Sequence, residues 1–307
     1  ADLDLGCRLA LGFRKGPLEL MRDTGDEEVA RVLERFAGER PGMPGPKRPL
    51  AAYQQFTRHI LVDDIDGVRL ITLRRPEAMN ALHDELTDEI LAAITGSEAD
   101  PAVQGFVITG YGPKAFCAGA DIGRFPSMLG DAAASAQYAR DCSRLLVHLD
   151  AMDKPVVAAL NGMALGGGLE LAMRCHSIVA VPEATLQFPE ITLGIVPGIG
   201  AMVVPYRRWP HAAATFNEML TRARRVKAPE ALELGVIDGV AADYAGLVEM
   251  AVGQVKALAG SIPRPASGAV TIEAPAEGPG EAVTGQPLSG EVLAILRGAV
   301  TEAAAAQ

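Results

Sequence analysis

The sequence has few cysteines, no long apolar run and no excess of basic residues. Its four cysteines are scattered along 307 residues without a short-spaced pair, which indicates neither a disulfide framework nor a cysteine-based zinc site. No stretch reaches about 18 consecutive apolar residues, and the first residues show no basic-then-apolar leader pattern. A net charge of −10 argues against nucleic acid or an anionic membrane as a partner. We therefore expect a cytoplasmic protein with no membrane segment and no metal site.

The composition, 49% hydrophobic and 21% charged, is that of a chain that can bury a sizeable core. One large domain with an appendage is more natural at this length than two equal domains. Changes in composition and apolar spacing predict five segments: a helical appendage at 1–37, a Pro/Gly/Lys/Arg-rich linker at 38–58, a core at 59–260, a flexible Pro/Gly/Ala-rich segment at 261–289, and a helix at 290–307.

Strands and helices recur along the predicted core. Asp66-Gly67 lies between two apolar runs and predicts a hairpin that joins strands at 60–62 and 68–73. Leu82, Leu86, Ile90 and Ile94 form the apolar stripe of a helix. Further strands are predicted at 106–108, 156–160, 177–181 and 184–188, and helices at 131–149, 199–206, 211–221, 228–234 and 243–259. Repeated strand-strand-helix units predict an α/β protein.

Three consecutive glycines, Gly166 to Gly168, follow the predicted strand at 156–160 and precede a helix-favouring run. Such a run is more often an ordinary loop than a site. Here, however, it predicts a sharp turn that opens a helix with uncovered N–H groups, where negative charge is stabilised. Glu170 falls in the first turn of that helix, and Glu190 follows Pro189 twenty residues later. Each glutamate taken alone is more often a surface carboxylate.

These segments together resemble the enoyl-CoA hydratase/isomerase, or crotonase, family from about Ile60 to about Leu258. The resemblance is carried by Arg75-Pro76 with Asn80-Ala81-Leu82, by Ala118-Gly119-Ala120-Asp121, by the glycine run and by Pro197-Gly198. It implies an α/β crotonase-like spiral of repeated β-β-α units with a C-terminal helical trimerisation region. It also implies an acyl-CoA substrate and assembly into homotrimers or hexamers.

The resemblance implies a role for five residues in the reaction. The backbone N–H groups of Ala120 and Gly167 would bind the thioester oxygen as it gains negative charge. Glu170 would act as the base toward water, and Glu190 would donate a proton to the α-carbon. The N–H of Gly198 would help to hold the water. Cys117, next to the first turn, is predicted to be a buried packing residue and not a nucleophile.

Coenzyme A enters this reading as part of the substrate, and no tightly bound cofactor is expected. Matching to the family implies that its binding residues include Ala78, Lys114, Ala118, Asp121 and Ile122. The adenine pocket cannot be named from residue patterns.

The leading interpretation is a 2-enoyl-CoA hydratase that forms 3-hydroxyacyl-CoA. An enoyl-CoA isomerase or an acyl-CoA hydrolase on the same fold, and a non-catalytic acyl-CoA-binding assembly domain, remain alternatives. The sequence departs from the family's usual pattern at two places. His176 stands where Asp is common, and Gly200-Ala201-Met202 replaces the usual Gly-Gly-Thr, which puts in question the support of the glycine-turn helix and the shape of the acyl pocket.

Residues 11–21 resemble the C-terminal helical domain of 3-hydroxyacyl-CoA dehydrogenases. This resemblance implies a bifunctional parent in which a dehydrogenase domain, missing from this chain, was fused to the hydratase. No Gly-x-Gly-x-x-Gly follows a predicted strand, so we expect no NAD binding.

Overall fold

The computed structural model describes residues 2–54, 58–121, 123 and 132–265. The chain divides into two compact units, Ala1–Arg58 and His59–Gln307. The predicted role of Ile122, most of the predicted flexible segment (266–289) and the predicted helix at 290–307 lie outside the described residues.

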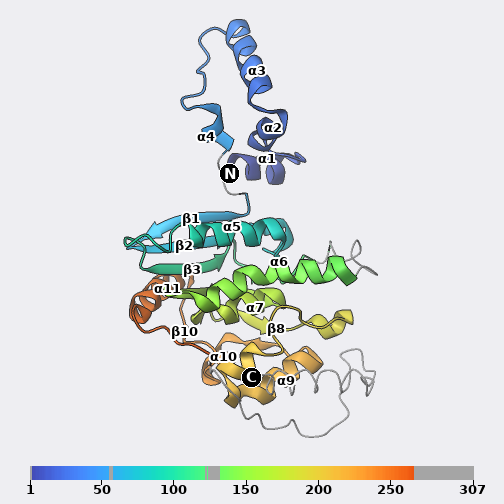
Figure 1. Ribbon diagram of the computed structural model, residues 1–307, viewed down its shortest axis with the longest axis vertical. Coiled ribbons are helices and arrows are strands. Elements are labelled where there is room, and N and C mark those ends of the chain that lie inside the picture. Colours follow the sequence, from blue (N-terminus) through green and yellow to red (C-terminus); the bar gives the residue numbers. More distant parts are fainter. Residues whose placement is uncertain (1, 55–57, 122, 124–131, 266–307) are drawn as a thin grey trace. The chain divides into compact units, whose positions relative to one another are not determined.

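The first unit is helical, as the apolar spacing predicts. Its helices are α1 (Asp2–Leu11), α2 (Pro17–Thr24), α3 (Asp26–Glu39) and α4 (Leu50–Gln54) (Figure 1). Pro17 stands at the first position of α2, where its missing N–H costs nothing. Gly25 separates α2 from α3 with φ of 87°, a backbone conformation that favours glycine.

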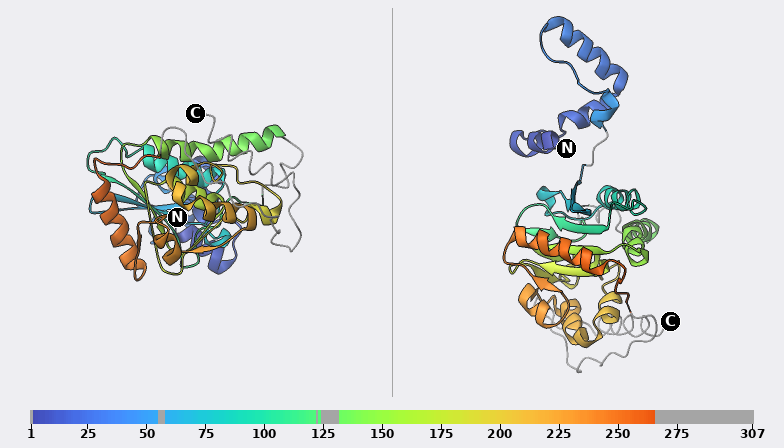
Figure 2. Two further views of the ribbon diagram at one scale, coloured as in Figure 1. Left: turned by 90° about the horizontal axis from the view of Figure 1, so that it is seen from below. Right: turned by 90° about the vertical axis from the view of Figure 1, so that its left-hand side faces the viewer.

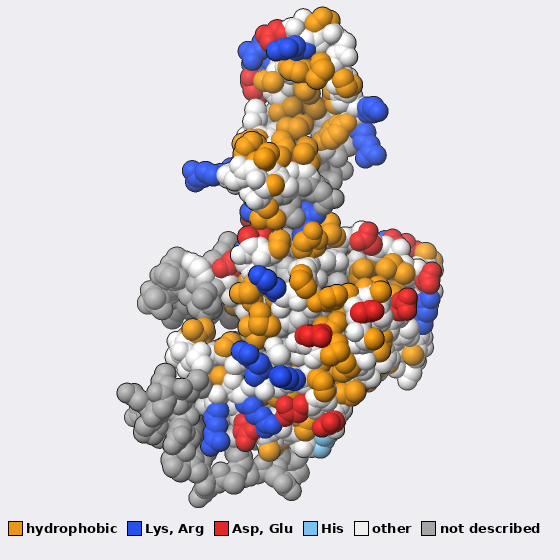
Figure 3. Space-filling model, turned by 180° about the vertical axis from the view of Figure 1, so that it is seen from behind, with side chains coloured by type: hydrophobic (Ala, Val, Ile, Leu, Met, Phe, Trp, Pro, Cys, Tyr) orange, Lys and Arg blue, Asp and Glu red, His pale blue; other side chains and the backbone are white. Residues whose placement is uncertain are grey.

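This first unit buries little apolar surface. Among its described side chains, Val29 is the one buried apolar group. Large apolar side chains lie open on its surface instead, and Figure 3 shows hydrophobic side chains gathered on one face of this unit. They are Leu3, Leu9, Leu11, Phe13, Leu20, Val32, Phe36 and Met43.

Two sheets organise the second unit. The larger has the strand order β1-β2-β3-β5-β7-β10, and the smaller has the order β4-β6-β8-β9. The strands are β1 (Ile60–Ile65), β2 (Val68–Leu73), β3 (Gly105–Gly110), β4 (Ala115–Cys117), β5 (Val156–Leu160), β6 (Met163–Leu165), β7 (Ser177–Ala180), β8 (Thr185–Gln187), β9 (Val226–Lys227) and β10 (Gly239–Val240).

The strands alternate between the two sheets along the chain. After the β1-β2 hairpin, β3, β5 and β7 join the larger sheet, while β4, β6 and β8 join the smaller one. Neighbours within each of these two series pair in parallel. Each strand-strand-helix unit therefore adds one strand to each sheet, which confirms the predicted crotonase-like spiral of β-β-α units.

The helices follow the predicted pattern with local differences. They are α5 (Asp84–Thr95), α6 (Ala132–Ala151), α7 (Gly167–Arg174), α8 (Val204–Arg208), α9 (Ala213–Arg222), α10 (Ala228–Glu233) and α11 (Tyr244–Leu258), with 3₁₀ turns η1 (Pro76–Ala78), η3 (Glu190–Leu193) and η4 (Pro210–Ala212). The helix predicted at 199–206 begins only at Val204. Leu82, predicted on the α5 stripe, precedes that helix and forms a β-bridge with Ala120 instead.

The core lies between the larger sheet and its helices. Strands β3 and β5 are buried along their whole length, and α11 packs along β3, β5 and β7 (Figure 2). Helix α5 contacts β1 and β2 and packs against α6. Within the described residues, no helix combines the length and the apolar character needed to cross a bilayer.

Candidate active site

The glycine run forms the connection from β6 to α7. Gly166 has φ of 46° and ψ of −124°, a backbone conformation that residues other than glycine rarely adopt. Its N–H donates to the Gln187 carbonyl at 2.9 Å, and its own carbonyl accepts from the Glu170 N–H at 2.9 Å. Helix α7 therefore begins at Gly167 with its first N–H groups free of intrahelical partners.

The turn at 118–121 lies across a narrow gap from the start of α7. A methyl group built on Gly167 would lie 3.4 Å from the Ala120 nitrogen, and one built on Gly119 would lie 3.6 Å from the Gly167 nitrogen. Within the described part of the chain, neither the Ala120 N–H nor the Gly167 N–H donates a hydrogen bond. The structure thus brings together the two backbone donors that the sequence resemblance paired.

Glu170 is buried in the first turn of α7, and its carboxylate is held by backbone. Its Oε1 accepts from the N–H groups of Ile199, at 3.0 Å, and of Ala201, at 2.8 Å. Burial raises the pKa of Glu170, and these two donors oppose the rise because they stabilise the ionised form. The departure at 200–202 therefore leaves a loop whose N–H groups still bind this glutamate.

Glu190 begins η3 and lies against the glycine turn. A methyl group on Gly166 would overlap its Oε1. Its Oε2 is buried and has no hydrogen-bond partner among the described residues. Burial, together with the charge of Glu170, raises the pKa of Glu190 from 4.5 to about 7. Glu170 and Glu190 therefore differ: the first has two N–H donors, and the second has none from a described neighbour.

Gly198 lies exposed in the loop that follows η3, immediately before the residue whose N–H binds Glu170. Its N–H donates to no described residue. A methyl group built on it would meet no described atom within 4 Å. Gly198 is therefore open to solvent and adjoins, along the chain, a residue that binds the Glu170 carboxylate.

Four of the five residues predicted to bind coenzyme A are described. Ala78 ends η1, and the next carbonyl, that of Met79, accepts from the Ala118 N–H at 3.0 Å, which places these two segments side by side. The side chain of Lys114 is exposed, while its carbonyl accepts from Met163. Asp121 is half-buried and forms an ion pair with Arg75.

Residues that the sequence analysis gave no role support these turns. The Asn80 amide donates to the carbonyls of Tyr111 and Ala115, and Asn80 itself has φ of 59°. Asn161, at the end of β5, accepts from the Gly110 N–H at 2.9 Å. The sequence signal that could have identified both residues is an asparagine directly after a turn or a buried strand, where its side-chain amide can hydrogen-bond to backbone groups that lack other partners.

The presence of His176 where the family commonly has Asp does not leave α7 without support. Its Nδ1 accepts from the Val156 N–H at 2.9 Å, which ties it to the start of β5. Burial, with nearby arginines, lowers its pKa to about 4, so it is neutral. The end of α7 is instead held by Arg208, which donates to the carbonyls of Met173, Cys175 and His176.

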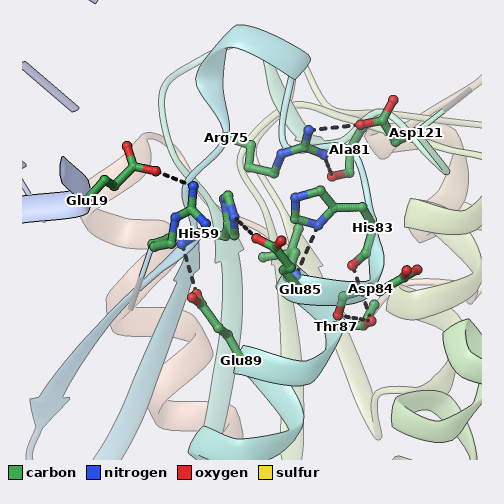
Figure 4. A network of polar contacts seen from close by, with 12 residues as sticks. Glu19, His59, Arg75, Ala81, His83, Asp84, Glu85, Thr87, Glu89 and Asp121 are labelled. Carbon is green, nitrogen blue, oxygen red and sulfur yellow. Dashed lines mark hydrogen bonds and ion pairs between the residues drawn. The ribbon is translucent and has the colours of Figure 1, made fainter. Parts of the chain in front are cut away.

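Two other groups of reactive side chains have structural roles. Cys117 is fully buried, and burial raises the pKa of its thiol to about 12. His59, His83 and Glu85 place possible ligand atoms within 4.8 Å of one another (Figure 4). His83 Nδ1, however, accepts from the Leu86 N–H at 3.0 Å, so the proton of neutral His83 lies on Nε2 and leaves no lone pair there for a metal.

The arrangement can stabilise an oxyanion and move protons beside it. Two backbone donors with no partner in the described protein face one gap, at the start of a helix whose dipole favours negative charge. Glu190 lies against the glycine turn beside the gap, and burial favours its carboxyl group in the protonated form. Glu170 lies in the first turn of α7, where burial also raises its pKa and two N–H donors oppose that rise. Such a set suits a reaction in which a carbonyl compound becomes an enolate and exchanges protons with a neighbouring acid and base.

Comparison with known proteins gives a family match over most of the core. The model of the family described as enoyl-CoA hydratase/isomerase matches residues 64–271. That span includes both turns, both glutamates and the loop that carries Gly198.

Individual relatives agree with the family match. The chain is 38% identical over 187 residues to a crotonyl-CoA hydratase of Syntrophomonas wolfei, covering 59% of this chain and 68% of that protein. It is 37% identical over 186 residues to a probable enoyl-CoA hydratase of Bacillus subtilis, covering 60% and 69%. The crystal structure of an enoyl-CoA hydratase from Bacillus anthracis superposes with a TM-score of 0.59 at 30% identity, covering 66% of this chain and 77% of that one.

Proposed function

This chain belongs to the enoyl-CoA hydratase/isomerase family of enzymes, and from that premise we propose that it is a 2-enoyl-CoA hydratase. It adds water across the double bond of an α,β-unsaturated acyl-CoA and releases 3-hydroxyacyl-CoA. The observation that carries the proposal is a pair of buried glutamates at the start of α7. Glu170 lies in the first turn of this helix, and Glu190 lies against Gly166, which precedes the gap between the Ala120 and Gly167 nitrogens. The names of the similar hydratases support the same reaction.

Each group in the proposed site has one task. Glu170, ionised, removes a proton from water as the water oxygen bonds to the β-carbon. The electrons of the double bond move to the thioester oxygen, and the N–H groups of Ala120 and Gly167 stabilise the charge that forms there. Glu190, protonated, then delivers its proton to the α-carbon. Transfer of one proton from Glu170 to Glu190 restores the starting state, so atoms and charge balance.

The contrast between the two glutamates supports this division of roles. Burial raises the pKa of both groups, but at Glu170 the N–H groups of Ile199 and Ala201 oppose the rise. At Glu190 only its own backbone N–H opposes it, and the pKa reaches about 7. A carboxyl group with a pKa near neutral pH can give and regain a proton in each cycle. The partnerless Glu190 Oε2 leaves a hydrogen-bonding position for a water molecule or a substrate.

We propose that the coenzyme A part lies along residues 118–121 and the facing η1 turn. The hydrogen bond from Ala118 to Met79 holds these backbones together, and the exposed Lys114 side chain is available to a phosphate. Asp121 contributes through its backbone, because Arg75 already pairs with its carboxylate. We also propose a homotrimer or a pair of trimers, supported by the exposed apolar side chains of Leu232 and Tyr244. Light scattering tests that assembly.

The direct test is hydration of crotonyl-CoA, followed by the loss of its conjugated absorbance. Glu170→Gln and Glu190→Gln should each lower kcat by about 100- to 10,000-fold, the range for removal of a general acid or base. Glu183→Gln, which changes an exposed carboxylate in the turn after β7, serves as the matched control and should retain full activity. Normal turnover by either site variant would refute the mechanism.

The same preparation separates the competing functions. A 3-enoyl-CoA substrate that is converted to the conjugated isomer without net hydration would identify an isomerase. Release of free coenzyme A thiol would identify a hydrolase. Tight binding of acyl-CoA with no turnover of short or long acyl chains would identify a binding domain.

A further inference from the structure

The Ala120 peptide is held in place by an adjacent segment of the chain. The Leu82 N–H donates to the Gly119 carbonyl at 2.7 Å, and the Leu82 carbonyl accepts from the Asp121 N–H at 2.8 Å. The Gly119 carbonyl belongs to the same peptide group as the Ala120 N–H, and the Asp121 N–H belongs to the next peptide group. The two bonds form the isolated β-bridge between Leu82 and Ala120. The direction of the Ala120 N–H therefore depends on where Leu82 is held.

Arg75 joins the two sides of this bridge through its side chain. Its Nη1 donates to the Ala81 carbonyl at 2.6 Å, and its Nη2 donates to Asp121 Oδ2 at 2.8 Å (Figure 4). Ala81 precedes Leu82, and Asp121 follows Ala120. One guanidinium thus spans both strands of the bridge, one residue away from the bridging pair on each strand.

The backbone of Arg75 is fixed as well. Its N–H donates to Asn80 Oδ1 at 3.0 Å, and its carbonyl accepts from the Asn80 N–H at 2.8 Å. The backbone from which the Arg75 side chain extends is therefore bound to the segment that carries Leu82. A planar fork with two separate donor groups suits this double contact, and a single ammonium cannot reproduce both contacts in the same geometry.

The ion pair is partly shielded from water, since the side chain of Arg75 is 11% exposed and that of Asp121 is 27% exposed. Burial alone would raise the pKa of Asp121, but Arg75 and the Gly123 N–H outweigh it and lower that pKa. Asp121 is therefore ionised at neutral pH, and the pair stays charged under assay conditions.

We propose that Arg75 is a positioning residue for catalysis, which acts by holding the Ala120 N–H toward the thioester oxygen. This inference rests on the proposed hydratase function. Both Nη groups of Arg75 bind acceptors inside the protein, so its role is distinct from that of a surface cation that binds a phosphate. Because the oxyanion forms only during the reaction, loss of Arg75 lowers kcat and leaves the affinity for coenzyme A thioesters nearly unchanged.

The test compares Arg75→Ala, Arg75→Lys and Asp121→Asn with a matched control, Arg69→Ala. Arg69 lies on the same strand region and makes a bidentate pair with Asp64, at 2.8 and 2.9 Å, but has no contact with residues 118–121. We expect Arg75→Ala to lower kcat for crotonyl-CoA by about 10- to 100-fold, the cost of misplacing a catalytic group by roughly 1 Å. KM should change less than about threefold, Arg75→Lys should recover part of the loss, and Arg69→Ala should match the unaltered enzyme.

A spectroscopic probe separates this inference from the proposed function. The thioester 4-dimethylaminocinnamoyl-CoA absorbs at longer wavelength when its carbonyl oxygen is polarised by hydrogen bonds. We expect the shift on binding to the unaltered protein and to Arg69→Ala, and a smaller shift with Arg75→Ala. If the unaltered protein shifts the probe but does not hydrate crotonyl-CoA, the hydratase proposal fails while the role of Arg75 is still measured by the probe.

Two results would overturn the role of Arg75. One is a folded Arg75→Ala variant with unchanged kcat and an unchanged probe shift. The other is a raised KM at unchanged kcat, which would make Arg75 a substrate-binding residue. Should Arg75→Ala not fold, Arg75→Lys and Asp121→Asn decide the question by the same two measurements, since both keep a hydrogen-bonding group at the pair.

Discussion

Glu190 should make the protein less stable as pH rises toward neutrality. Its pKa in the folded protein is about 7, against an ordinary value of 4.5. The folded state therefore binds this proton more tightly than the unfolded state does. The stabilisation is complete below the unfolded pKa and is lost as pH rises through the folded one. Because each pKa unit is worth about 1.4 kcal/mol, the free energy of unfolding should fall by about 3 kcal/mol over this range.

The assay is urea unfolding followed by circular dichroism at about pH 5, 6, 7 and 8, in the unaltered protein, Glu190→Gln and Glu183→Gln. Glu190 is only 9% exposed, so solvent screening reduces the effect little. From pH 5 to pH 8, Glu190→Gln should gain about 2 to 3 kcal/mol of unfolding free energy relative to the unaltered protein. Glu183→Gln should follow the unaltered protein at every pH. If the curves for Glu190→Gln and the unaltered protein run parallel, Glu190 ionises normally and its assignment as the acid is wrong.

Three further predictions concern the same site. The value of kcat/KM should fall on the alkaline side with a midpoint near pH 7, because Glu190 must be protonated to act. A steady-state pH profile checks this prediction, and a midpoint two pH units higher would contradict it. Gly167→Ala should lower kcat for crotonyl-CoA by about 100-fold or more and leave the circular dichroism spectrum unchanged. The reason is that the added methyl group would lie 3.4 Å from the Ala120 nitrogen and fill the gap. Normal turnover would show that the gap does not hold the carbonyl. Gly166→Ala should lower the free energy of unfolding by roughly 1 to 3 kcal/mol, because φ at this residue is 46° and the added methyl group would overlap Glu190. Thermal unfolding measures the change, and an unchanged Tm would mean that the turn can adopt another conformation.

The parts of the site that depend on neighbours along the chain could be predicted from the sequence. The glycine run after a buried strand predicted the turn before α7, and Asp66-Gly67 predicted the β1-β2 hairpin, which is confirmed. The resemblance of ordered motifs predicted the family and the spiral of β-β-α units, and both are confirmed. The errors of the sequence predictions lie at element boundaries. Apolar spacing places Leu82 in the helix that became α5, but Leu82 precedes this helix and forms a β-bridge with Ala120.

Contacts between distant segments could not be predicted in this way. Arg75 and Asp121 are 46 residues apart, and Gly110 and Asn161 are 51 apart. Nothing in the local sequence states that Arg208 holds the end of α7. These pairs depend on the pairing of strands into the two sheets, which brings the turns at the strand ends to the same region.

The sequence by itself determined the residue types that the chemistry uses: glycines that allow a close backbone approach, and two glutamates at a spacing matched to their turns. Only the tertiary structure decided their state. The pKa of Glu190 near 7 comes from burial and from the charge of Glu170, and the two N–H donors to Glu170 come from a loop about 30 residues away. The physical reason is that burial and electrostatic environment are produced by packing between segments, whereas propensity and turn chemistry act between neighbours in the chain.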